Sequence, residues 1–80
     1  MQVYPNPAHT HVNILINVES DQADLVLTDI LGRQIDMIHV SGQDSVMVDL
    51  SNKNITDGWI FVGLHVDGQR IATKKLLLVR

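Results

Sequence analysis

Four histidines and eight aspartates are the residues of this chain whose side chains could do chemistry. The sequence has no cysteine, which excludes a thiolate nucleophile, a thiolate metal site and a disulfide. His9 and His11 stand two residues apart, and on a strand this spacing would present both imidazoles to one metal ion. A metal site needs further ligands, and the histidines that remain are His39 and His65. We therefore expect surface histidines rather than a metal centre, and no cofactor.

The aspartates are scattered, and most stand at predicted turns, where an Asp side chain accepts hydrogen bonds from its own backbone. A carboxylate pair for glycoside hydrolysis would need a cleft, and one small core leaves little room for it. The sequence also contains no phosphate-binding glycine loop and no Gly-x-Ser-x-Gly nucleophile elbow. We therefore expect no enzymatic activity and no small-molecule substrate. The eight positions are Asp21, Asp24, Asp29, Asp36, Asp44, Asp49, Asp57 and Asp67.

Trp59 and Phe61 are the candidates for a binding surface. They share one face of a predicted strand, and Ile60 lies on the other face. If the aromatic face is open, it forms a patch of the kind that binds sugars or protein partners. If Leu76 and Leu78 cover it, the two rings belong to the core. Because the chain has only three aromatic residues, we expect both rings in the core.

Length and charge restrict the class of protein further. Eighty residues make one small domain, which can fold alone while burying about 60% of its unfolded surface. The net charge of −3 disfavours non-specific binding to nucleic acid or to an anionic membrane. No apolar run approaches the roughly 20 residues that span a bilayer, and no signal peptide is visible after Met1. If the protein is exported, we expect its signal peptide to lie on sequence that precedes this segment.

Apolar residues alternate with polar ones along most of the chain, and this period of two predicts β-strands. No segment shows a useful helical repeat. Turn residues separate the runs, with Gly32 as the residue expected at positive φ between two of them. Six or seven short strands of this kind predict an antiparallel β-sandwich. The expected strands are Val3-Tyr4, His11–Val18, Ala23–Asp29, Arg33–Val40, Ser45–Leu50, Trp59–Val66 and Gln69–Val79.

The last two strands are predicted to form a hairpin around Asp67-Gly68, because both central positions of a two-residue hairpin turn need positive φ. This hairpin is the most apolar part of the chain. The stretch from Leu76 to Val79 is apolar on both faces, which predicts a covered strand. Chain ends are usually polar and frayed unless they are tied down. An apolar end therefore indicates that this strand is held in place.

Several stretches resemble one family in their order and spacing. Val3-Tyr4-Pro5-Asn6-Pro7 resembles its Tyr-Pro-Asn-Pro opening, and Leu27 to Arg33 resembles its Asp-x-x-Gly-Arg turn. Val48-Asp49-Leu50-Ser51 matches the short strand that follows, Gly58 matches the glycine before the penultimate strand, and Lys74-Lys75-Leu76 resembles the basic and apolar close. The family is the C-terminal sorting domain of the Bacteroidetes type IX secretion system, and the resemblance runs from Val3 to Arg80. The motif residues are Tyr4, Pro5, Asn6, Pro7, Asp29, Gly32, Arg33 and Gly58.

Two positions depart from the family pattern. The family commonly has a tyrosine two residues after the glycine at Gly58, where this chain has Ile60. Gly63 stands in the middle of a predicted strand, where a glycine weakens packing. Both departures concern the details of the penultimate strand.

The resemblance implies an immunoglobulin-like antiparallel β-sandwich of about seven strands. It also implies that the domain acts as a secretion signal and has no catalytic activity. Residues 1–80 would be a single C-terminal sorting domain at the end of a longer secreted precursor. The implied partners are an N-terminal cargo, the type IX translocon and a surface sortase-like protease. The implied destination is the cell surface or the medium, reached through the periplasm and the outer membrane. The implied signal residues are Lys74, Lys75, Leu76, Leu77, Leu78, Val79 and Arg80.

Alternatives remain open from the sequence. The last strand could pair with a partner or with a second copy by strand addition. The domain could also be a carbohydrate- or protein-binding module of an extracellular enzyme or adhesin, using Trp59 and Phe61. A structural spacer of an adhesin stalk is a further alternative.

Overall fold

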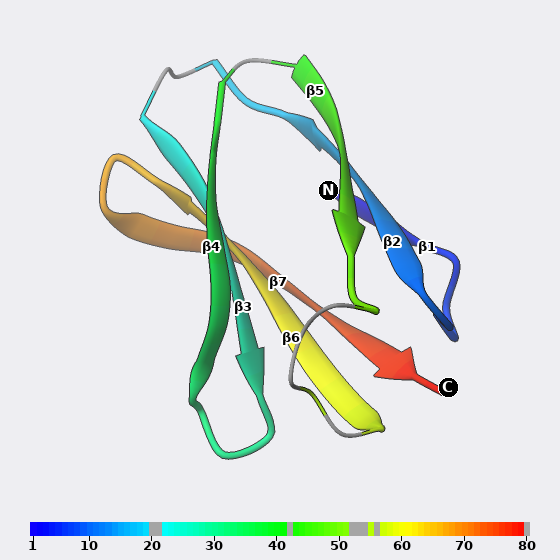
Figure 1. Cartoon of the computed structure of the whole chain (residues 1–80). Coiled ribbons are helices and arrows are strands. Elements are labelled where there is room, and N and C mark those ends of the chain that lie inside the picture. The colour runs from blue at the N-terminus through cyan, green and yellow to red at the C-terminus, as the bar shows by residue number, and fades with distance from the viewer. Residues whose placement is uncertain (20–21, 42, 52–54, 56, 80) are drawn as a thin grey trace.

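The computed structural model describes residues 1–19, 22–41, 43–51, 55 and 57–79, without the side chains of residues 43 and 44. This part of the chain forms seven β-strands and no helix, in two antiparallel sheets (Figure 1). One sheet has the order β1-β2-β5 and the other β4-β3-β6-β7. The all-β prediction is confirmed. The strands are β1 (Gln2–Tyr4), β2 (His11–Asn17), β3 (Ala23–Asp29), β4 (Gln34–Val40), β5 (Gln43–Asp49), β6 (Gly58–Val66) and β7 (Gln69–Leu78).

The chain crosses between the sheets three times, from β2 to β3, from β4 to β5 and from β5 to β6. The hairpins β3–β4 and β6–β7 each stay within the four-stranded sheet. This connectivity is typical of immunoglobulin-like sandwiches, as the resemblance implied. A search of the described residues finds no helix with the length and hydropathy that crossing a membrane requires.

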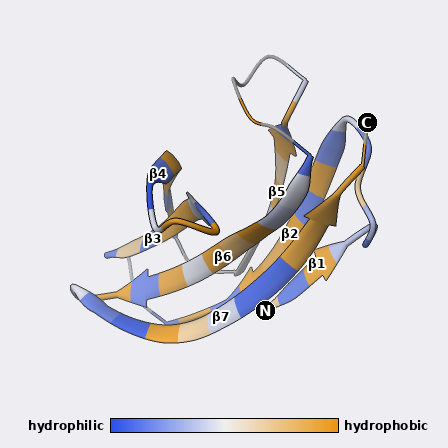
Figure 2. Ribbon diagram, turned by 90° about the horizontal axis from the view of Figure 1, so that it is seen from below, coloured by the Kyte–Doolittle hydropathy of each residue, from blue (hydrophilic) through white to orange (hydrophobic). Residues whose placement is uncertain are grey.

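The core lies between the two sheets and takes every second residue from the inner strands. On β6, Ile60, Val62 and Leu64, which alternation places on one face, are all buried. Figure 2 shows the resulting alternation of hydrophobic and hydrophilic residues along the strands. No polar or charged residue of the described part is buried. The buried residues are Ala8, Val12, Ile14, Ile16, Ala23, Leu25, Leu27, Val40, Val48, Leu50, Ile60, Val62, Leu64, Leu76 and Leu78.

The turns also follow the sequence. Asp67 has a φ of 52° and Gly68 a φ of 82°, so both central residues of the β6–β7 turn are left-handed, as expected for Asp-Gly. Gly32 has a φ of 84°, which confirms the predicted positive φ. Strand ends agree with the prediction within two residues, and the largest shift is at Gln43, where β5 begins two residues early. Parts of the turns expected at Asp21 and before Gly58 lie outside the described residues.

β7 departs from the prediction of a strand covered on both faces. It is one of the two edge strands of its sheet and pairs with β6 alone among the strands. Leu76 and Leu78 are buried, Leu77 is half-buried and Val79 is exposed. The apolar run does not reflect cover on both faces, because each strand of a two-sheet sandwich presents one face to the core and the other to solvent.

Candidate functional site

The segment between β1 and β2 lies along the edge of β7 that does not pair with β6. The residues in contact are about 70 positions apart in the sequence. Ala8 forms a parallel bridge with Leu78 and is fully buried. The Ala8 N–H donates to the carbonyl of Leu77 at 2.8 Å, and the Val79 N–H donates to the carbonyl of Ala8 at 2.8 Å. We call residues 6–9 the strap. The strap thus closes the end of an edge strand and ties the two ends of the sequence together.

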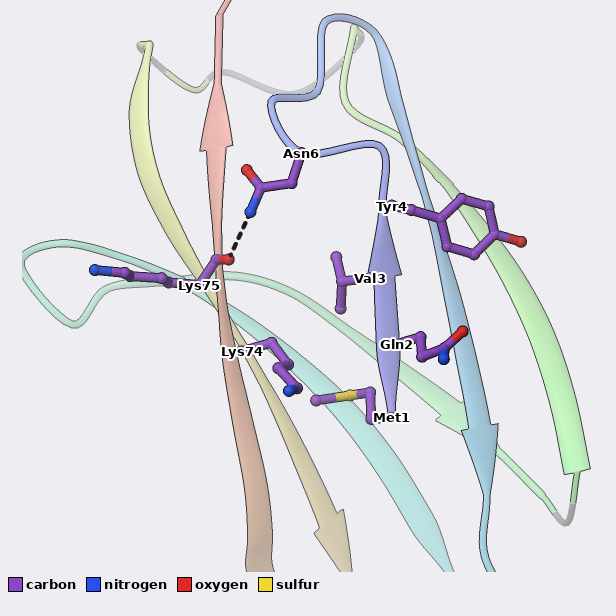
Figure 3. Close-up of a pocket in the computed structure, with 7 residues that line it drawn as sticks. All are labelled: Met1, Gln2, Val3, Tyr4, Asn6, Lys74 and Lys75. Atoms are coloured by element: carbon purple, nitrogen blue, oxygen red, sulfur yellow. Dashed lines mark hydrogen bonds between the residues drawn. The ribbon is translucent and has the colours of Figure 1, made fainter.

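Asn6 extends this contact through its side chain. Its Oδ1 accepts a hydrogen bond from the Leu77 N–H at 3.0 Å, and its Nδ2 donates to the carbonyl of Lys75 at 3.4 Å (Figure 3). A neighbouring strand would present one acceptor and one donor in the same way. Pro5 and Pro7 on either side have no backbone N–H to offer. The Asn6 amide therefore supplies the pairing groups that a proline-flanked backbone lacks.

His9 completes the strap at the far end of the strand. Its Nδ1–H donates to the carbonyl of Val79 at 2.6 Å. Together, the strap residues bind the backbone groups that point away from β6, from the Lys75 carbonyl to the Val79 carbonyl. This part of the edge is closed to a further strand, which is one way that proteins protect sheet edges.

The predicted signal residues separate into two sets. Leu76 and Leu78 point into the core and are fully buried, so their side chains stabilise the fold. Lys74, Lys75 and Val79 are exposed, and Leu77 is half-buried on the outer face; Arg80 lies outside the described residues. Among the predicted signal residues that the structure describes, only Lys74, Lys75, Leu77 and Val79 are accessible to another molecule while the domain is folded.

The prediction that Trp59 and Phe61 are core residues is wrong. Leu76 pairs with Ile60 and faces the core with it, so the aromatic residues of β6 lie on the outer face of the four-stranded sheet. Trp59 is 40% exposed and Phe61 is half-buried. The Lys75 Nζ lies 4.7 Å from the centroid of the Trp59 ring, which is a cation–π contact. The accessible residues of the predicted signal are therefore continuous with an aromatic surface.

The Asp-x-x-Gly-Arg motif builds the β3–β4 turn around one carboxylate. Asp29 Oδ1 accepts from the N–H groups of Leu31 and Arg33, each at 2.9 Å, and Oδ2 accepts from the Arg33 Nε–H at 2.8 Å. Gly32 provides the left-handed residue of the turn. The turn holds Ile30 and Leu31 in solvent, 70% and 76% exposed. The motif thus has a structural role, with Asp29 fixing the geometry.

These hydrogen bonds lower the pKa of the Asp29 carboxyl below its ordinary value, chiefly through the backbone N–H of Arg33. The ionised carboxylate therefore stabilises the fold above about pH 4, and this contribution is lost as the pH falls through the depressed pKa. We expect Asp29→Asn to lower the melting temperature at pH 7 and to approach the parent protein below pH 4. Melting curves from pH 2.5 to 7 test this, with Glu19→Gln as a control at an exposed carboxylate. A constant difference at every pH would contradict it.

Asp49 plays a similar local role in the Val48–Ser51 motif. Its Oδ1 accepts from the N–H of Ser51 at 2.9 Å and from the Ser51 hydroxyl at 2.6 Å. The Leu50 N–H donates to the carbonyl of Thr10, close to the strap. The motif therefore ends β5 and buries Val48 and Leu50 in the core.

The histidines do not gather. His9 belongs to the strap, His11 begins β2, and the Nδ1 of His39 lies 3.1 Å from Asp24 Oδ1 on the outer face of the four-stranded sheet. His65 lies against Gly63, where its Nε2 would be 3.4 Å from an added Cβ. Among the described residues no three potential ligands could hold a metal ion together.

Sequence reasoning missed the contact between the strap and β7. Two features of the sequence carry the signal: a proline-flanked asparagine that cannot enter a ladder, and an apolar strand at the other end of the chain. Neither feature identifies the other as its partner.

One family model matches the chain over residues 2–79, and its description is "Secretion system C-terminal sorting domain". Comparisons with curated proteins and with solved structures gave no match. The matched region includes the strap, the Asp29 turn and the whole of β7. The family resemblance of the motifs is thus confirmed over nearly the full length, and the chain belongs to the family of C-terminal sorting domains of the type IX secretion system.

Proposed function

We propose that this domain is a non-catalytic signal that directs an N-terminal cargo protein through the type IX secretion system to the cell surface. Family membership supports a sorting role. The chain would be the last domain of a longer secreted precursor, and a surface sortase-like protease would remove it after passage through the outer membrane.

The single observation that carries the proposal is the division of the signal residues. The strap occupies the backbone edge from the Lys75 carbonyl to Val79, so backbone pairing is not open to a partner there. A translocon that binds the folded domain would therefore recognise side chains in this part of the strand. The side chains that a translocon could contact are those of Lys75, Leu77 and Val79, which lie next to Trp59. Apolar and aromatic groups flanked by a cation are typical of protein interfaces.

Export of a reporter fused to this chain tests the proposal in a Bacteroidetes host that uses this secretion system. We expect Lys75→Glu combined with Leu77→Ser to reduce surface reporter at least about tenfold. A central interface residue often contributes about 1 kcal/mol or more, and a loss of about 1.4 kcal/mol already weakens binding tenfold. Both side chains face away from the core, so the fold should persist, as a melting curve would verify. The matched control is Gln34→Glu with Met37→Ser on β4, at the opposite edge of the same sheet. Unchanged export of the variant with Lys75→Glu and Leu77→Ser would contradict the proposal.

The exposed Trp59 also favours a second candidate, a carbohydrate- or protein-binding module. An aromatic ring binds sugars through its face, and here the Lys75 ammonium lies over the ring. A glycan array decides between the two, since a sorting signal needs no glycan affinity. Strand pairing between two copies is a further proposal, which the strap limits to the part of β7 that it does not cover.

A further inference from the structure

Charge is segregated along this acidic chain. Residues 1–18 contain no Asp, Glu, Lys or Arg, and residues 68–80 contain no Asp or Glu. All nine acidic residues lie between 19 and 67. The structure places β1 beside β7, so the two segments without carboxylates share one corner of the sandwich. The basic residues of the last segment are Arg70, Lys74, Lys75 and Arg80.

A groove of about 470 Å³ runs between β1 and β7 at this corner. Figure 3 shows the Lys74 side chain pointing toward Met1 across the groove, whereas Lys75 points away from it. Lys74 and Lys75 are the charged side chains of the lining, and both are exposed. Val3 adds an apolar side chain to it. The groove is thus cationic within a protein of net charge −3, and both apolar and uncharged polar side chains line the rest of it.

The backbone edge of β7 is open beside this groove. The groups bound by the strap show that Leu77 and Val79 direct their N–H and C=O away from β6. In an antiparallel strand every second residue does so, which places the N–H and C=O of Thr73 and the N–H of Lys75 on the same edge. Among the described residues, the strap reaches only the carbonyl of Lys75 and none of these three groups. A row of unpaired donors and acceptors is a template for another strand.

We infer that an extended acidic segment of a partner protein adds to β7 along residues 69–75, as a fifth strand of the four-stranded sheet. The open groups of Thr73 and Lys75 would pair with its backbone, and its alternating carboxylates would face Lys74 on one side and Lys75 with Arg70 on the other. The strap shows that this edge accepts an added segment. A second copy is less well suited, because two such edges would bring their lysines and arginines together.

A blocked octapeptide of alternating valine and glutamate is the probe. It is titrated into the ¹⁵N-labelled 80-residue chain at low salt, with amide shifts and amide hydrogen exchange as readouts. We expect the Thr73 and Lys75 amides to shift and their exchange to slow about tenfold at saturation. Lys74→Gln and Lys75→Gln should each weaken binding about threefold, as expected for exposed charge pairs. Gln34→Glu, which changes the charge equally at the opposite edge, should have little effect.

Two further probes separate strand addition from simple attraction of an anion. An acidic peptide with two consecutive prolines between its four glutamates keeps the charge but places prolines, which have no N–H, at pairing positions in either register. It should therefore not form a continuous ladder and should not protect Thr73. A valine–lysine peptide should not bind. Equal binding of the proline peptide, absence of protection at Thr73, or dimerisation through this edge without peptide would each overturn the inference. The inference goes beyond the sorting role, and since the measurement uses no translocon, its failure would leave the export test untouched.

Discussion

Leu78→Ala is expected to lower the free energy of unfolding by about 2–5 kcal/mol, because it removes a fully buried side chain from between the two sheets. A domain of this length has a total stability on the order of 4–12 kcal/mol. The substitution would therefore remove a large part of it, and would do so at a residue that the family resemblance counts among the signal residues. Urea denaturation followed by Trp59 fluorescence measures the loss.

The neighbouring substitution Leu77→Ala is the matched control. It removes the same atoms from the same strand, but the side chain is half-buried on the outer face and opposes Trp59. We expect a loss of about 1 kcal/mol or less. In the export assay Leu78→Ala should act by unfolding the domain, whereas Leu77→Ala should act with the fold intact. Equal losses of stability would show that the two leucines are not divided between core and surface.

Strands and turns could be predicted from the sequence because their causes are local. A period of two places Val12, Ile14 and Ile16 on one face whatever lies across from them, and the structure buries all three. The Asp67-Gly68 turn needs only its two residues to adopt positive φ, and both do. Where only one face of a strand is apolar, the sequence therefore predicts which face of that strand packs against the core.

The order of strands in the sheets could not be predicted, and the wrong placement of Trp59 follows from this. On β6 and on the end of β7 both faces carry large apolar residues, so alternation does not say which face is inside. The answer depends on which face the second sheet covers, and the structure places Ile60, Leu76 and Leu78 on that face. The exposed cation–π contact of Lys75 and Trp59 is a consequence of the same arrangement.

The family motifs gain distinct physical roles once the contacts are known. The Asp29 motif holds its own turn, with every partner of the carboxylate within four residues. The opening motif acts across the whole chain, since the partners of Asn6 are Lys75 and Leu77. Local motifs of the first kind can be interpreted from sequence. Motifs of the second kind need the fold, because the residues that they serve are not their neighbours.

Asn6→Ala is expected to destabilise the domain by about 1–2 kcal/mol, although Asn6 is exposed and packs no side chain into the core. Alanine would leave the N–H of Leu77 and the carbonyl of Lys75 without their partner. Asn6→Asp keeps the acceptor for the Leu77 N–H and loses the donor to Lys75, so a smaller loss is expected. Chemical denaturation measures both variants, and Asn17→Ala, at an exposed asparagine at the end of β2, should change stability by less than about 0.5 kcal/mol.

Amide exchange locates the effect of Asn6→Ala on the strand itself. The Leu77 N–H should exchange faster in this variant, whereas the N–H groups of Leu76 and Leu78, which face β6, should stay protected. The variant would also leave the Lys75 carbonyl and the Leu77 N–H open on the edge of β7, while the bonds of Ala8 and His9 remain, and each open group increases the risk of edge-to-edge association. If the Leu77 amide exchanged at the same rate with and without Asn6, the side-chain amide would not be the group that closes this edge, and the opening motif would need another role.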